Sequence, residues 1–96
     1  ALRDKLRNAD DPGADLATDT LVAGIQQAVA TEWGVTVDGL RSKTRTKTLT
    51  VPRQAAMYLL RQITGLQLVE IGAAFGNRDH STVIHSLERV EEMLQS

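Results

Sequence analysis

Four consecutive side chains near the end of the chain have the chemistry to read nucleic-acid bases: Asp79, His80, Ser81 and Thr82. They follow a predicted short helix and a tight turn at Gly76, so they open a second helix. A carboxylate accepts from a cytosine amino group, an imidazole reaches a base acceptor or a thymine methyl, and hydroxyls suit several partners. The pattern predicts base readout by a helix tip. Helix capping by Asp79 and an ordinary surface histidine at position 80 are equally good interpretations.

The same residue types do not predict an enzyme. Asp79, His80 and Ser81 are the types found in a hydrolase triad, but neighbouring helical residues diverge by about 100° and form no hydrogen-bonded relay. His80 and His85 are five residues apart, the wrong spacing for two metal ligands on one helical face. Cysteine and a glycine-rich phosphate loop are both absent from the sequence. We therefore expect no catalytic residue, no metal site and no cofactor.

A basic stretch precedes these residues. From Arg41 to Arg61 the sequence holds six basic residues and no acidic one, although the net charge of the chain is −1. Residues 1–38 hold seven acids and three bases (−4), residues 39–78 hold seven bases and one acid (+6), and residues 79–96 hold four acids and one base (−3). This block distribution predicts a basic face for a phosphate backbone. The alternatives are a solvated loop without a partner and a helical interaction module that docks an acidic protein.

The basic stretch divides into a loop and a helix. The Ser/Thr-rich segment 41–49 has little apolar content, so we expect an exposed loop that can enter an A·T-rich minor groove. The candidates for that groove are Arg45 and Lys47, and the candidates for backbone phosphates on the following helix are Arg53, Gln54 and Arg61. The N-terminus of that helix also favours phosphate.

Apolar spacing predicts an all-helical fold of four or five helices, with a further helical turn at residues 1–8 and a linker at residues 10–18. The expected helices run from Asp19 or Thr20 to Trp33, over Val35–Leu40, from a Thr50 cap to Thr64, over Gln67–Phe75, and from Asp79 to Leu94 or Gln95. The expected core residues are Val22, Ile25, Val29, Trp33, Ala55, Ala56, Leu59, Leu60, Ile63, Leu68, Ile71, Phe75, Val83, Leu87, Val90 and Leu94. Gly72 would let another helix approach closely, and Gly76 would supply a positive φ.

The run IGAAFGNRDHSTVIHS at residues 71–86 closely resembles the signature of the C-terminal domain of the DnaA family of bacterial replication initiators. The segments SKTR at 42–45 and PRQ at 52–54 also fit that family. The resemblance covers about residues 19–94 and implies a Trp-repressor-like helix-turn-helix that binds DnaA boxes at a replication origin. It also implies that residues 1–18 are a hinge from an AAA+ ATPase domain, that residues 19–96 bind DNA, and that the chain is part of a longer protein.

The resemblance assigns roles to particular residues. It implies base contacts by Arg45, Leu68, Val69, Asp79, His80, Ser81 and Thr82, and phosphate contacts by Lys43, Lys47, Arg53, Gln54, Arg61 and Arg78. Three positions depart from the family pattern: Val69 stands where proline is frequent, Ser81 where threonine is common, and Lys47 where arginine occurs. Double-stranded DNA is the implied partner, with other initiator copies and regulatory proteins for the longer protein. We expect no membrane span and a place in the bacterial cytoplasm, at the nucleoid.

Overall fold

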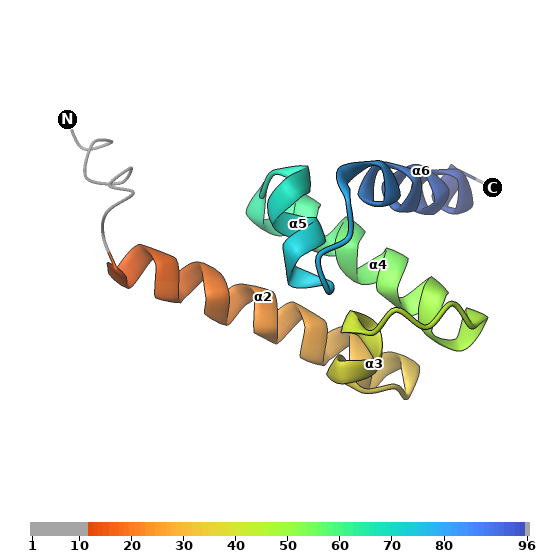
Figure 1. The fold of residues 1–96 in the computed structure, drawn as a ribbon, viewed down its shortest axis with the longest axis horizontal. Coiled ribbons are helices and arrows are strands. Elements are labelled where there is room, and N and C mark those ends of the chain that lie inside the picture. The colour runs from red at the N-terminus through yellow and green to blue at the C-terminus, as the bar shows by residue number, and fades with distance from the viewer. Residues whose placement is uncertain (1–11, 96) are drawn as a thin grey trace.

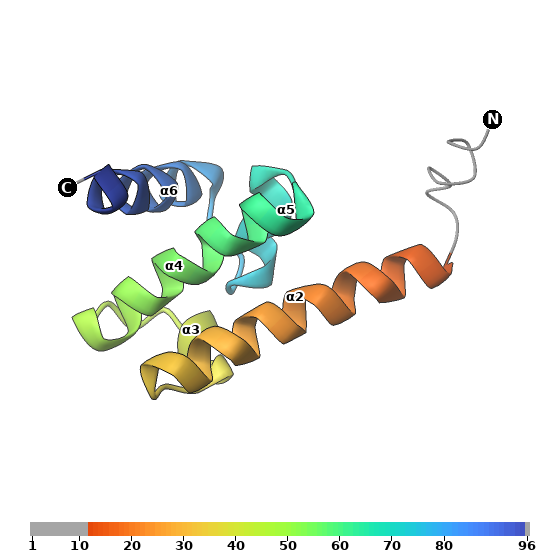
Figure 2. The same cartoon turned by 180° about the vertical axis from the view of Figure 1, so that it is seen from behind.

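Five helices make up the described part of the chain, residues 12–95 of a computed structural model (Figure 1). They are α2 (Pro12–Trp33), α3 (Val37–Arg41), α4 (Lys47–Thr64), α5 (Leu68–Ala74) and α6 (His80–Gln95). Seen from either side, α4 lies between α2 and α6, and α3 and α5 pack at its two ends (Figures 1 and 2). No strand occurs in residues 12–95, so the predicted all-helical fold is confirmed.

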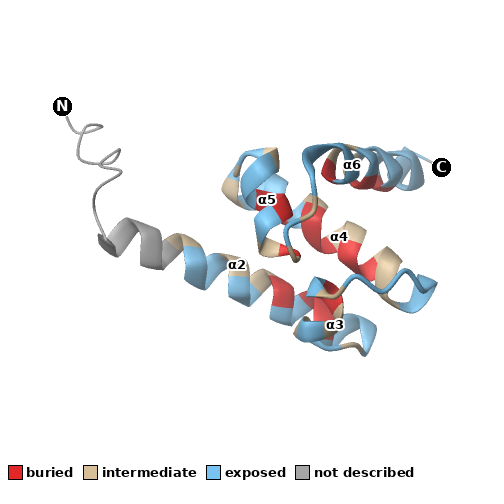
Figure 3. Cartoon of the chain, viewed as in Figure 1, coloured by how far each residue is buried: buried red, intermediate tan, exposed pale blue. Residues whose placement is uncertain are grey.

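One apolar core joins the C-terminal half of α2 to the inner faces of the other helices (Figure 3). Its buried members are Val29, Ala30, Leu40, Ala56, Met57, Leu60, Ile71, Phe75 and Val83. Phe75 is fully buried at the end of α5. Full burial of such a side chain stabilises the fold by about 1.5–3 kcal/mol. The core therefore fixes α5, and with it the turn that leads into α6.

Four predicted core residues are substantially exposed, so those predictions were wrong. Trp33 is 49% exposed because it is the last residue of α2 and no further turn covers it. Leu59 and Ile63 are 38% and 59% exposed. They lie beside the buried face of α4, which runs through Pro52, Arg53, Ala56, Met57 and Leu60. Leu94 is 66% exposed in the last turn of α6, beyond the buried Val90.

Two helices begin earlier than the sequence predicts. α2 starts at Pro12, so residues 12–18, where the sequence predicts a linker, are helical. Proline is well tolerated in a first helical turn, which explains this start. α4 starts at Lys47, so Pro52 lies in its second turn and the exposed loop shortens to residues 42–46. The predicted helical turn at residues 1–8 lies outside the described residues.

The turn between α5 and α6 depends on two glycines. Gly76 has a φ of 84°, as predicted, and a Cβ added there would lie 2.3 Å from the Arg41 carbonyl oxygen. A Cβ added at Gly72 would lie 2.1 Å from the Arg78 carbonyl oxygen. Gly72 therefore admits the close approach of the turn, and the Val83 side chain of α6 lies 3.5 Å from the same Cβ position. Asn77 adopts a second left-handed conformation, with a φ of 61°, which asparagine tolerates better than most residues.

Candidate nucleic-acid interface

The start of α6 presents the four predicted base-reading residues to solvent. Asp79, His80, Ser81 and Thr82 are all exposed. The Thr82 backbone N–H donates to Asp79 Oδ1 at 3.0 Å, so Asp79 caps the helix. This hydrogen bond is the largest cause that lowers the pKa of the Asp79 carboxyl, and the nearby His80 contributes in the same direction. Asp79 is thus a carboxylate at neutral pH, held at the tip of α6.

The start of α5 lies next to this tip. Leu68 packs partly against the core, whereas Val69 is 69% exposed. One shallow hollow is lined by Arg61, Gln67, Leu68, Val69 and His80, from the end of α4, the start of α5 and the start of α6. The structure therefore brings the two predicted apolar contacts together with His80 and one predicted phosphate ligand. Although three of these side chains are polar, most of the accessible surface in the hollow is apolar. Such a surface suits contact with a thymine methyl group.

A second cleft, of about 290 Å³, lies between the loop, α4 and α6. It is lined by Arg45, Thr50, Arg53, Gln54, Arg78, Thr82, His85 and Ser86. None of these described lining residues is a carboxylate, so the cleft is cationic. It joins five of the predicted contact residues from separate segments of the chain. Sequence reasoning did not assign Thr50, His85 or Ser86 to the site, although His85 follows Thr82 by three residues and so shares its face of α6.

Arg53 has a structural role that the sequence analysis missed. Its side chain is only 5% exposed and donates four hydrogen bonds to backbone carbonyls. Nε binds the Leu40 oxygen at 2.7 Å, Nη1 binds the Thr44 oxygen at 3.0 Å, and Nη2 binds the oxygens of Gly39 and Ser42, both at 3.0 Å. Only one of the five guanidinium N–H groups remains for another partner. Burial, and then the neighbouring Arg78, lower the pKa of Arg53.

This arrangement fits poorly with the predicted phosphate contact of Arg53. A phosphate ligand presents its N–H groups to solvent, whereas this guanidinium faces the chain's own carbonyls. A sequence signal for the buried position did exist, because Arg53 precedes Ala56 and Met57 by three and four residues. That spacing puts it on the core face of α4.

The other predicted phosphate ligands are more accessible. Lys43 is exposed on the loop and Lys47 at the first residue of α4, and Arg45, predicted for the minor groove, is exposed between them. Arg61 is exposed, and its Nη1 donates to the Leu66 carbonyl. Gln54 is half-buried in the cleft wall.

Arg78 is half-buried immediately before the Asp79 cap. Its Nη2 donates to the Ser42 carbonyl, and its Nε is buried without a hydrogen-bond partner. A buried donor without a partner is uncommon in folded proteins. It leaves the cationic cleft with one unsatisfied N–H group.

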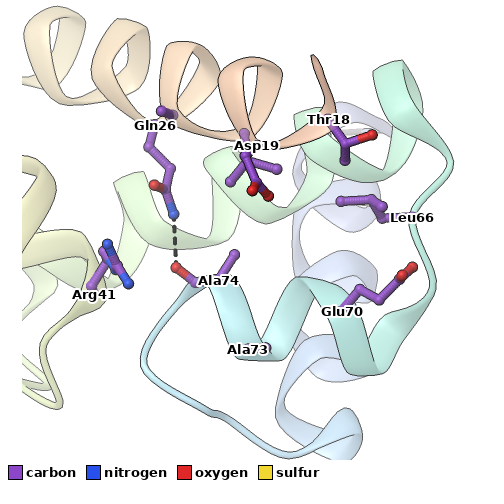
Figure 4. A pocket seen from close by; sticks show the side chains of 10 residues that line it. Thr18, Asp19, Gln26, Arg41, Leu66, Glu70, Ala73 and Ala74 are labelled. Atoms are coloured by element: carbon purple, nitrogen blue, oxygen red, sulfur yellow. Dashed lines mark hydrogen bonds between the residues drawn. The ribbon is translucent and has the colours of Figure 1, made fainter. Parts of the chain in front are cut away.

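A separate hollow, of about 510 Å³, lies between α2 and α5, away from the shallow hollow and the cationic cleft (Figure 4). The Gln26 side-chain amide donates to the Ala74 carbonyl at 2.8 Å in this hollow, which ties α2 to the end of α5. Gln26 is 3% exposed. None of the predicted contact residues lines this hollow. The hollow therefore belongs to the packing contact between α2 and α5, which orients α5.

Neither a metal site nor a membrane-spanning helix occurs in residues 12–95. No group of three or more histidine, aspartate or glutamate side chains is arranged to hold a metal ion there. No helix in the same range combines the length and the apolarity required to cross a bilayer.

Two of the matches to known proteins concern most of the chain. The family model described as the bacterial DnaA protein helix-turn-helix matches residues 22–90. A crystal structure described as a DNA replication initiation factor has the same fold, with a TM-score of 0.82 and 33% sequence identity. That similarity covers 95% of this chain and 29% of the solved chain, so this chain spans less than a third of that protein's length. All predicted contact residues lie within the matched range 22–90.

Proposed function

Because the chain belongs to the bacterial DnaA helix-turn-helix family, we propose that it binds DnaA boxes at a replication origin with sequence specificity. One observation carries this proposal: the exposed start of α6 adjoins a cationic cleft, and Thr82 belongs to both. The helix tip can enter a major groove while the cleft faces phosphates. No catalytic role is assigned to this DNA-binding module.

In this proposal, α6 and the start of α5 read the major groove. Asp79 keeps its cap to Thr82 through one oxygen, Oδ1. Its second oxygen can accept from a cytosine amino group, so capping and base contact are compatible. His80 and Ser81 offer hydrogen-bonding groups to neighbouring base edges, and Val69 offers a methyl contact. The exposure of Val69 supports this role, because an apolar side chain gains by leaving water.

Arg45 reads the adjacent minor groove in this proposal. It is exposed on the short loop between α3 and α4, and a narrow A·T-rich groove attracts such a guanidinium. Phosphate contacts come from Lys43, Lys47, Gln54, Arg61 and Arg78. Arg53 is left out of this set because its donors bind the chain itself.

The same proposal extends to the longer protein that the match implies. We infer a replication initiator with an ATPase domain beyond this chain, acting in the bacterial cytoplasm at the nucleoid. Its further partners would be other initiator copies and regulatory proteins. Binding of the isolated domain to an origin fragment tests the first step of this inference.

The decisive experiment compares wild type and His80→Ala on two duplexes. One duplex is the tightest binder selected from a random pool, and the other has the same composition in scrambled order. Loss of a base contact costs about 1–3 kcal/mol, so His80→Ala should weaken binding to the selected duplex about tenfold to a hundredfold. Binding to the scrambled duplex should change little, because it rests on phosphates.

A matched control is Gln27→Ala, at an exposed position on α2 that lines neither the hollow nor the cleft. It should leave both affinities unchanged. Equal losses on the two duplexes from His80→Ala would contradict base readout. A wild-type chain with no preference among duplexes would instead favour an interaction module for an acidic protein.

A further inference from the structure

Arg53 connects its own helix, α4, to two other parts of the backbone. Its four hydrogen bonds reach α3 at Gly39 and Leu40 and the loop at Ser42 and Thr44. The loop residues 43–46 belong to no helix. The Thr44 N–H donates to Ser42 Oγ, and the Thr46 carbonyl accepts from the Leu49 and Thr50 N–H groups. Arg53 thus holds the part of the loop just before Arg45, through the Ser42 and Thr44 carbonyls.

A second arginine, from the turn before α6, reaches the carbonyl of Ser42 as well. The Ser42 oxygen accepts from Arg53 Nη2 and also from Arg78 Nη2. The Arg78 backbone N–H donates to the Gly72 oxygen at 3.0 Å, which fixes this residue to the end of α5. Arg78 is followed directly by the Asp79 cap. The Ser42 carbonyl therefore joins the Arg45 loop to the start of α6.

The turn glycine makes a further contact between the same two parts. At Gly76 only hydrogen atoms fit beside the Arg41 carbonyl, because a Cβ would lie 2.3 Å from that oxygen. The end of α3 and the turn before α6 are thus packed backbone against backbone. Two independent contacts, one of packing and one of hydrogen bonds, connect these segments.

The charges at the junction oppose its geometry, so its hydrogen bonds must hold the two arginines in place. Two guanidinium groups share one carbonyl oxygen, and no carboxylate is among the described residues that line the adjoining cleft. Like charges held close together disfavour this geometry in the free protein. The directed fork of arginine, which lysine lacks, is what the four carbonyls require.

We propose that Arg53 and Arg78 are positioning residues that set the Arg45 loop relative to the start of α6 through the Ser42 carbonyl. This inference rests on the proposed function and deepens it. The loop and the helix tip enter two different grooves of one duplex, so their spacing must match the spacing of the grooves. Arg53 contributes to minor-groove reading through Arg45, without touching DNA itself.

A double-mutant cycle tests the proposal. Arg45→Ala should weaken binding of the selected duplex about tenfold to a hundredfold in the wild-type background. In the Arg53→Lys background, the same change should cost less than about threefold, because the loop is already displaced. Arg53→Lys keeps the positive charge, so a direct phosphate contact would be largely preserved, whereas positioning would be lost. His80→Ala should cost as much in Arg53→Lys as in wild type, since α6 remains in place.

Arg61→Met is the matched control, because it removes an exposed arginine from the same binding face outside the junction. Arg45→Ala should keep its full effect in that background. If Arg45→Ala costs the same in Arg53→Lys as in wild type, the proposal is overturned while the proposed function stands. If wild type shows no preference for the selected duplex, the proposed function itself fails.

Thermal unfolding of each variant shows whether it is folded at the temperature of the assay. Should Arg53→Lys not fold, Arg78→Gln takes its place in the cycle, because it removes one bond to Ser42 and leaves Arg53 intact. A reduced effect of Arg45→Ala in Arg78→Gln supports the junction, and an undiminished effect refutes it.

Discussion

Replacement of Gly72 by alanine should destabilise the domain through a single backbone clash. The new Cβ would lie 2.1 Å from the Arg78 carbonyl oxygen, more than 1 Å short of the 3.4 Å at which ordinary contact begins. The obstacle is backbone, so no side-chain rotation relieves it. The Gly72 carbonyl also accepts from the Phe75 and Arg78 N–H groups, at 3.1 and 3.0 Å. A shift of the turn weakens both bonds.

The expected cost follows from three contributions. Overpacking costs about 1–3 kcal/mol, and each weakened hydrogen bond costs up to about 1 kcal/mol. The better helix propensity of alanine returns about 1 kcal/mol. These contributions sum to about 0–4 kcal/mol, and the central value of about 2 kcal/mol lowers the midpoint of thermal unfolding by roughly 8–16 °C for a domain of this size.

Gly24→Ala is the matched control, because Gly24 is helical, exposed and free of neighbours within 4 Å of an added Cβ. This change should raise stability by up to about 1 kcal/mol. Thermal unfolding followed by circular dichroism measures both variants. A Gly72→Ala domain that unfolds at or above the wild-type temperature would refute the reasoning. On DNA, Gly72→Ala should lower affinity even where the domain is fully folded, since the turn carries Arg78 and Asp79.

Two further predictions concern charge. Arg61→Ala should weaken binding to every duplex and reduce the steepness of log K against log salt by about one unit, from roughly −4 for about four phosphates. Titrations at several salt concentrations measure this, and a loss confined to the selected duplex would contradict it. For Asp79, hydrogen bonds from Thr82 lower the pKa in the folded state. Its stabilising contribution is therefore present above the unfolded pKa and is lost as pH falls through the folded pKa. Asp79→Asn keeps a capping side chain but should lack this acid dependence, and identical profiles of unfolding temperature from about pH 6 to pH 2 for the two proteins would disprove it.

The turn and the tip of α6 could be predicted from the sequence because their signals are local. Gly76 required a positive φ, and Asp79 had the right side chain and place for a cap. Both depend on residues within four positions of each other. The start of α4 was predicted wrongly: Thr50 was expected to cap the helix, whereas the helix begins at Lys47 and Pro52 lies in its second turn.

The role of Arg53 could not be predicted from its charge. Helical spacing placed it near Ala56 and Leu60, but its four acceptors lie nine to fourteen residues earlier in the chain. Those acceptors are backbone carbonyls, which have no sequence signature. The close approach of Gly76 to the Arg41 carbonyl likewise could not be predicted from the sequence. The part of the site that local sequence patterns did not predict thus depends on long-range contacts with backbone atoms.

The arginines of the basic block show why charge alone overestimates the phosphate contacts. Arg45 and Arg61 are exposed, Arg78 is half-buried at the Ser42 carbonyl, and Arg53 is buried. Only an accessible cation displaces counterions from DNA, so the salt dependence of binding reports fewer contacts than the sequence count. A buried arginine contributes to specificity instead, because it fixes where the accessible ones lie. Exposed arginines in this interface therefore contribute to affinity, whereas the buried arginine fixes the positions of the others.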